Sequence, residues 1–361
     1  MDDGGLGVRS VDVLLAGQAS SGAFVASPNF PTYGYSWLRD GSFCARALDV
    51  VGEHQRAGDF HRWVERTIVG QRDRVEAVVS KLAAGITPDH EEMLPTRYTL
   101  DGDLEHHDPA DPWPNYQLDG YGTWLWELRE HLRSSGSEEF DKEAVELAAR
   151  YLVAAWRTDC CDCWEELGDG QHASTLAAIA AGLQAAGTLL DEPAHLDEAV
   201  QVRSYLLETF VRDGIFRKGA ADDRLDASLL WLVLPFGVVA ADDPVMQRTV
   251  EELREDLAGP GGGLYRYLGD TYYGGGQWVL LTCWLAWYDA VVGRRADFEV
   301  RRRWVVQQAT AELDLPEQIL TEVQDPRMVE PWEKRWGPVA NPLLWSHAMY
   351  LIMSEAATPW K

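Results

Sequence analysis

The sequence has few basic residues, few cysteines and no long uninterrupted apolar run, and each shortage excludes a class of protein. Its 32 lysines and arginines stand against 58 aspartates and glutamates, which gives a net charge of −26. A chain with this charge repels phosphate backbones, so we expect no nucleic-acid partner. No stretch approaches about 18–20 uncharged apolar residues, and the first residues lack the pattern of a secretion signal. We therefore expect neither a membrane protein nor an exported one.

The few cysteines predict free thiols. There are five of them, Cys44, Cys160, Cys161, Cys163 and Cys283, an odd number for a chain of 361 residues. They do not suggest a disulfide framework, and a reducing cytoplasm is the expected location. The cluster at 160–163 has no second Cys or His pair at a zinc-like spacing. The sequence therefore predicts neither a metal site nor another cofactor.

Aromatic residues are plentiful, with 16 tryptophans, 13 tyrosines and 9 phenylalanines. Aromatic rings stack on the C–H faces of sugars, and they also fill large apolar cores. Composition leaves both explanations open.

Apolar residues recur at helical spacing, and alternating strand-like runs are scarce. The predicted helices cover residues 40–52, 57–84, 116–134, 139–157, 173–188, 193–213, 226–240, 244–257, 273–292, 297–313 and 340–355. Helices of similar length joined by short and long loops are typical of a closed ring of helical hairpins, although an open solenoid has the same periodicity. Because the long loops carry aromatic and acidic residues, we expect a pocket at one end of the ring. Residues 1–361 are predicted to form one domain, with residues 1–26 as a lead-in.

Two loop segments supply candidate catalytic carboxylates. Trp164-Glu165-Glu166 places a glutamate beside an indole, where burial and the second carboxylate raise its pKa, as a general acid requires. Leu315-Pro316-Glu317-Gln318 places a glutamate beside an amide, suited to activating water. Taken alone, each motif is better explained by ordinary helix-end chemistry. As a pair, the two glutamates fit hydrolysis of an acetal, which needs one proton donor and one activated water.

Two further segments combine aromatic residues, an arginine and an aspartate. One runs from Tyr33 to Asp40 and contains Trp37 and Arg39, and the other runs from Tyr265 to Tyr273. Such groups match vicinal hydroxyls and the flat face of a sugar. Asp40 is also a candidate N-cap for the helix that follows it.

Five motifs in this order resemble the catalytic domain of family 15 glycoside hydrolases, the glucoamylase and glucodextranase group. They are Tyr-x-Tyr-x-Trp-x-Arg-Asp, Trp-Glu-Glu, Arg-Tyr-x-x-Asp-Thr-Tyr-Tyr, Leu-Pro-Glu-Gln and Trp-Ser-His-Ala, spread from Ser27 to about Tyr350. The resemblance implies an all-α (α/α)6 barrel. Because only residues 1–26 precede the first motif and few follow the last, we expect no added β-sandwich or starch-binding domain. The resemblance also implies an inverting exo-acting hydrolase.

The resemblance further implies roles for individual residues. Glu165 would be the general acid and Glu317 the general base, with Tyr33 near the catalytic water. The residues implied to bind substrate are Trp37, Arg39, Asp40, Trp113, Trp164, Glu166, Arg266, Tyr272 and Tyr273.

The function expected from these motifs is release of β-glucose from short α-glucosides such as isomaltose or malto-oligosaccharides. Three alternatives remain open: a trehalase-type hydrolase, a glucan-binding helical toroid without activity, and a sugar epimerase or isomerase. The last would need paired histidines, and only His172 and His347 lie in candidate pocket motifs. The sequence does not indicate the oligomeric state.

Overall fold

The computed structural model describes residues 5–105 and 116–357, and most of this chain is helical. The α-helices are α1 (Leu6–Ala16), α2 (Leu38–Val50), α3 (His54–Gly70), α4 (Arg72–Ala83), α5 (Asp119–Ser135), α6 (Lys142–Ala155), α7 (Ala173–Leu190), α8 (Pro193–Thr209), α9 (Pro244–Leu257), α10 (Val279–Val291), α11 (Arg295–Gln307), α12 (Val329–Trp336) and α13 (Leu344–Ala356). Short 3₁₀ turns cover Pro31–Tyr33, His90–Glu92, Ala227–Leu232, Pro260–Gly262, Tyr272–Gly274 and Pro326–Met328. The strands are β1 (Ser36–Trp37), β2 (Arg97–Tyr98), β3 (Val211–Arg212), β4 (Ile215–Phe216), β5 (Gln277–Trp278) and β6 (Gln318–Ile319).

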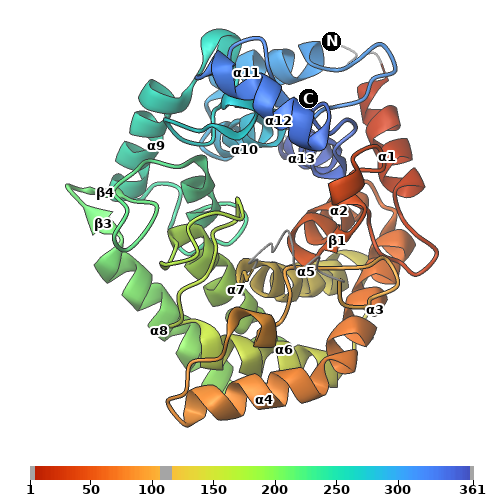
Figure 1. The fold of residues 1–361 in the computed structure, drawn as a ribbon, viewed down its shortest axis with the longest axis vertical. Helices are drawn as coiled ribbons and strands as arrows, with labels where there is room; N and C mark the ends of the chain where they lie inside the picture. The colour runs from red at the N-terminus through yellow and green to blue at the C-terminus, as the bar shows by residue number, and fades with distance from the viewer. Residues whose placement is uncertain (1–4, 106–115, 358–361) are drawn as a thin grey trace.

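The helices form two concentric rings (Figure 1). The inner ring consists of α2, α5, α7, the turn Ala227–Leu232, α10 and α13, and each packs on the next until α13 packs on α2. Around it, α1, α3, α6, α8, α9 and α11 each cover an inner element. The ring is therefore closed, and the predicted (α/α)6 barrel is confirmed.

The inner helices are apolar on several faces because they pack on both sides. Helix α7 has no charged residue over its 18 positions and is mostly buried. By length and composition it is apolar enough to cross a membrane, which corrects the expectation that no such run exists. Its small residues serve close packing instead: a Cβ on Gly122 of α5 would lie 2.4 Å from the Ala178 carbonyl oxygen of α7. Helix α7 is accordingly a core helix of the barrel.

A cluster of large rings fills the barrel axis. Phe43 of α2 lies 5.5 Å from Trp345 of α13 in a stacked arrangement and 4.8 Å from Trp284 of α10. Trp231 stacks on Trp284 at 5.2 Å, and these rings are almost fully buried. Many of the tryptophans therefore build the core, and the barrel interior is packed rather than hollow.

Three predicted helices differ from the structure. The range 57–84 is divided at Gln71 into α3 and α4. The range 226–240 contains only the turn Ala227–Leu232, because Pro235 lacks an N–H and its ring would meet the carbonyl of Trp231 in a continued helix. Helices α1 and α12 were not predicted, and the predicted helix 273–292 begins only at Val279.

Two antiparallel ribbons lie beside the starts of inner helices. Strand β1 pairs with β2 directly before α2, so that Trp37 faces Arg97 in register. Strand β5 pairs with β6 directly before α10, so that Trp278 faces Gln318. Each ribbon places a tryptophan at the N-terminal end of an inner helix, and the second also fixes the residue that precedes β6, Glu317.

Candidate functional site

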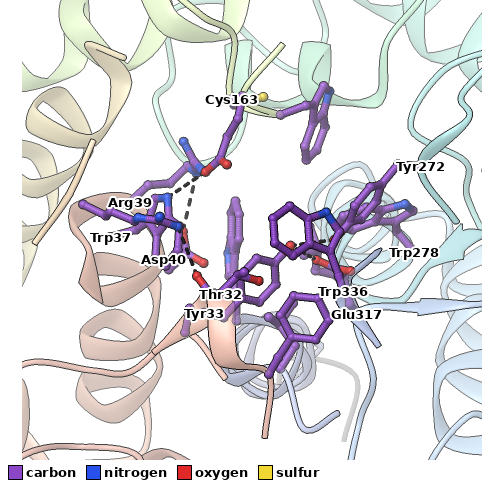
Figure 2. A pocket seen from close by; sticks show the side chains of 18 of the residues that line it. Thr32, Tyr33, Trp37, Arg39, Asp40, Cys163, Tyr272, Trp278, Glu317 and Trp336 are labelled. Carbon is purple, nitrogen blue, oxygen red and sulfur yellow. Dashed lines mark hydrogen bonds and ion pairs between the residues drawn. The ribbon is translucent and has the colours of Figure 1, made fainter. Parts of the chain in front are cut away.

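A cavity of about 540 Å³ lies at the end of the barrel where α2, α10 and α13 begin. Most predicted site residues line it, namely Tyr33, Trp37, Arg39, Asp40, Trp164, Glu165, Glu166, Arg266, Tyr272 and Glu317. Figure 2 shows several of them pointing into one hollow. Segments more than 100 residues apart in sequence thus meet in a single site.

Glu165 lies in a tight turn rather than a helix. Its φ of 69° is unusual for a residue with a side chain, and such strain persists where the surroundings hold it. The indole Nε1 of Trp37 donates a hydrogen bond of 2.7 Å to its Oε1. Burial raises the pKa of Glu165 to about 7, although Arg39, Arg97 and this hydrogen bond oppose the shift. The carboxyl group is therefore able to hold a proton near neutral pH.

Glu317 lies where the chain enters β6. The hydroxyl of Tyr33 donates to its Oε1 at 2.9 Å, and the Tyr33 and Tyr272 hydroxyls lie 2.9 Å apart. Its Oε2 is buried and has no hydrogen-bond partner among the described residues. A buried carboxylate oxygen without a protein partner is free to accept a hydrogen bond from water. Burial also raises the pKa of Glu317 to about 7, against the Tyr33 hydrogen bond and Arg266.

The two glutamates share the cavity, and no hydrogen bond joins their carboxyl groups within the described chain. Their mutual repulsion contributes to the raised pKa of Glu317, after burial. With both pKa values raised to about 7, each carboxyl group can change its protonation state near neutral pH. One group can donate a proton while the other accepts one.

Arg39 and Asp40 form the floor of the cavity. Arg39 donates to Gln117 Oε1 at 2.6 Å and to Asp119 Oδ2 at 2.9 Å, which fixes its guanidinium. Asp40 is not the N-cap of α2 as expected, because the helix begins at Leu38 and Asp40 lies in its first turn. Burial raises the pKa of Asp40 to about 6, with Arg39 opposing.

Glu166 points to a different group of residues from Glu165. It accepts hydrogen bonds from Arg266 Nη2 at 3.2 Å and from the Tyr267 hydroxyl at 2.5 Å. Arg266 is itself held by Asp270 through contacts of 2.8 and 2.6 Å. The two adjacent glutamates therefore have separate environments, one beside Trp37 and one beside Arg266.

Tyr273 and Trp113 differ from the other predicted residues. Tyr273 does not line the cavity: it is fully buried, and its hydroxyl donates to the Gly337 carbonyl. Tyr272 is the tyrosine that contacts Tyr33. Trp113 lies outside the described residues.

Several lining residues were not predicted. They are Ala26, Phe30, Thr32, Arg97, Glu105, Cys163, Trp278, Leu280, Trp332, Arg335, Trp336, Leu343 and Trp345. Trp278 had a usable signal, since an aromatic residue precedes α10 as Trp37 precedes α2. Trp332 and Trp336 are four residues apart on α12, a spacing that places both on one face of a helix.

The histidines and cysteines do not contribute to the cavity in the way an isomerase or metal site requires. Neither His172 nor His347 lines it. The five cysteines are buried, and none of them forms a disulfide in the described structure. In the part of the chain that the structure describes, no group of three or more His, Cys, Asp or Glu residues is placed to hold a metal ion.

The barrel, the two glutamates that share one cavity and the surrounding tryptophans define the chain as a glycoside hydrolase. The chain belongs to the glycosyl hydrolases family 15, whose family model matches residues 8–313. This confirms the resemblance drawn from the motifs.

Relatives and solved structures agree with the family. The chain is 41% identical over 351 residues to the isomaltose glucohydrolase of Kribbella flavida. The alignment covers 95% of this chain and 90% of that protein. A glycosidase structure in complex with glucose aligns with a TM-score of 0.91 at 39% identity, covering 98% and 96% of the two chains. A bacterial glucoamylase complexed with acarbose has a TM-score of 0.77 at 19% identity, and the match covers 99% of this chain and 56% of that one, which shows the shared fold. Together these matches support an enzyme that hydrolyses α-glucosides.

Proposed function

We propose that the chain is an inverting exo-acting hydrolase that releases β-glucose from the non-reducing end of short α-glucosides, with isomaltose as the first candidate substrate. The observation that carries this proposal is the pair of glutamates lining one cavity, with Glu317 Oε2 buried and unpartnered among the described residues. In the proposed reaction Glu165 protonates the glycosidic oxygen as the bond to the anomeric carbon breaks. Glu317 removes a proton from the attacking water, which adds to the opposite face.

The cavity geometry supports exo action. Its floor is formed by Arg39, Asp40 and Trp345, and below Trp345 the rings of Phe43 and Trp284 fill the barrel. A glucan chain therefore has no path through the barrel, and only a terminal sugar reaches the floor. The guanidinium of Arg39 and the carboxyl of Asp40 are suited to bind the hydroxyls of that sugar.

Isomaltose is proposed because the Kribbella flavida relative is an isomaltose glucohydrolase and covers nearly the whole chain. Glucose release should be measured side by side on isomaltose, maltose, trehalose and their longer homologues, for the wild type and for Glu317→Ala. We expect isomaltose to be the best substrate, and the variant to lose about 10²–10⁴-fold in rate. If trehalose is cleaved in preference to isomaltose, the proposed substrate is wrong. If Glu317→Ala remains active, the assignment of Glu317 as the general base is wrong.

A glucan-binding toroid without activity is the other function to test. It predicts measurable glucan affinity and no glucose release from any of these substrates. The geometry favours the enzyme, since a binding surface has no need of two desolvated carboxyl groups whose pKa values are both raised to about 7 by burial. We further propose a reducing, cytoplasmic location, which is consistent with five buried cysteines that form no disulfide in the described structure.

A further inference from the structure

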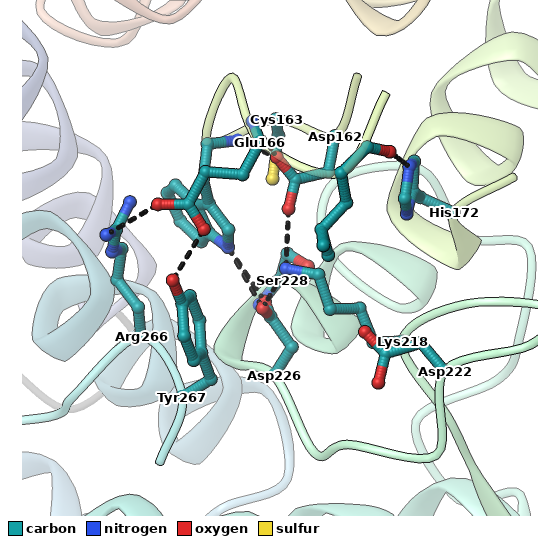
Figure 3. A network of polar contacts seen from close by, with 12 residues as sticks. Asp162, Cys163, Glu166, His172, Lys218, Asp222, Asp226, Ser228, Arg266 and Tyr267 are labelled. Carbon is teal, nitrogen blue, oxygen red and sulfur yellow. Dashed lines mark hydrogen bonds and ion pairs between the residues drawn. The ribbon is translucent and has the colours of Figure 1, made fainter. Parts of the chain in front are cut away.

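A buried lysine, Lys218, lies between Asp162 and Asp226 (Figure 3). Asp162 begins the turn that carries Glu165. Lys218 Nζ is 2.6 Å from Asp162 Oδ2 and 2.5 Å from Asp226 Oδ2. The lysine side chain is 2% exposed, and none of the three residues lines the cavity. Burying an ammonium group between two carboxylates costs desolvation free energy. The two aspartates that it contacts also accept hydrogen bonds from the turn and from the cavity wall.

Asp162 organises the turn around Glu165. Its Oδ1 accepts hydrogen bonds from the backbone N–H groups of Trp164 and Glu166, both at 2.9 Å. Its backbone carbonyl accepts from Glu165 N at 3.0 Å, and its own N–H donates to the Glu166 carbonyl at 2.8 Å. These four hydrogen bonds surround Glu165 and stabilise its unusual backbone conformation, with φ of 69°.

Asp226 holds the cavity wall next to the same turn. Its carboxylate accepts a hydrogen bond from Trp164 Nε1 at 3.0 Å and another from Ser228 N at 2.8 Å. Burial alone would lower the pKa of Lys218, but Asp226 and Asp162 outweigh it and raise that pKa, so the lysine stays charged. The ammonium group of Lys218 therefore links Asp162, which organises the turn, to Asp226, which accepts a hydrogen bond from the indole of Trp164.

We propose that Lys218 is a positioning residue for proton donation: by pairing with Asp162 and Asp226 it fixes the turn that aims Glu165 at the glycosidic oxygen. This inference rests on the proposed function, in which Glu165 is the acid. Without the ammonium, two carboxylates 2.5–2.6 Å from the same point lose their shared counter-ion. One of them then takes up a proton or moves away, and Asp162 no longer holds the turn.

This role predicts a specific kinetic defect. A misplaced acid slows cleavage only when the leaving group needs a proton, as the sugar alcohol of isomaltose does. Fluoride leaves α-glucosyl fluoride without one. A variant that only weakens the fold or the sugar site slows both substrates together.

The test compares isomaltose with α-glucosyl fluoride in three variants. Lys218→Met alone leaves two unpaired buried carboxylates, so the main variant is Lys218→Met/Asp226→Asn, which keeps the buried net charge and an acceptor for Trp164. The control is Arg301→Met, which removes a buried cation 2.6 Å from Asp289, far along the chain from the turn. Glu165→Gln is the reference for complete loss of the acid.

We expect the double variant to lose about 10²-fold in kcat on isomaltose, the size of effect that a misplacement of about 1 Å produces. Its KM and its rate on α-glucosyl fluoride should change less than about 3-fold, and Arg301→Met should show no preference between the substrates. If Glu165→Gln discriminates between the substrates and the double variant does not, the role of Lys218 is wrong. If Glu165→Gln itself fails to discriminate, the assignment of the acid is wrong.

Discussion

Replacement of Trp37 by phenylalanine removes one identified hydrogen bond from the proposed acid. The indole Nε1 donates to Glu165 Oε1 at 2.7 Å and stabilises the ionised carboxylate. This bond opposes the effect of burial, which raises the pKa of Glu165 to about 7. Its removal should therefore raise that pKa further, so that Glu165 keeps its proton to higher pH.

The size of the shift follows from the strength of the bond. A hydrogen bond to a charged group contributes about 1.5–3 kcal/mol, and one pKa unit corresponds to about 1.4 kcal/mol. The full range is about 1–2 units. Because phenylalanine leaves space in which water can replace part of the bond, we expect about 1 unit.

The assay is the pH dependence of kcat/KM on isomaltose, in which the alkaline limb should move up by about 1 unit in Trp37→Phe. The control is Trp278→Phe: it also removes an indole from the cavity wall, but Trp278 Nε1 has no hydrogen-bond partner among the described residues. The activity of Trp278→Phe should fall, but the alkaline limb of its pH profile should stay where it is in the wild type. An alkaline limb that stays in place in Trp37→Phe, or moves equally in both variants, would refute the reasoning.

Three further predictions test the site and the barrel. Glu165→Gln should lower the rate on isomaltose by about 10²–10⁴-fold with little change in KM, and a steady-state rate near that of the wild type would contradict the assignment. Gly122→Ala should cost about 1–3 kcal/mol, because the new Cβ meets the Ala178 carbonyl, and an unchanged Tm would exclude this close contact. Burial raises the pKa of Glu127 above its usual value, so the folded state holds this proton more tightly than the unfolded state and loses stability as pH rises above about 4.5. Glu127→Gln should thus raise Tm at pH 8 and leave it nearly unchanged at pH 4, and an equal change at both pH values would contradict this.

The helical architecture could be predicted from the sequence because the period of apolar residues directly reports helices. The periodicity alone could not predict ring closure, since the packing of α13 on α2 joins residues about 300 positions apart, and the closed barrel was predicted from the family resemblance. The prediction of a helix at 226–240 was wrong because the apolar pattern was followed although Pro235, a helix-breaking residue, lies within this range. Helix α12 has only eight residues, too few for the pattern to stand out.

Site residues that belong to short sequence motifs could be predicted. Residues that reach the site only through tertiary contacts could not. Glu165 and Glu317 were identified from short motifs, but only the structure shows that one accepts from Trp37 and the other from Tyr33. Arg97 reaches the cavity through the pairing of β2 with β1, which no motif indicated. The same holds for Lys218, whose partners lie 56 and 8 residues away in sequence and meet only in the folded chain.

The anomeric form of the first glucose released is the most direct test of paired action by Glu165 and Glu317 through one water molecule. It is read by ¹H NMR within the first turnovers of isomaltose, before the anomers interconvert. The account predicts a β-anomer signal that appears first, followed by slow growth of the α-anomer. Initial appearance of α-glucose would contradict it.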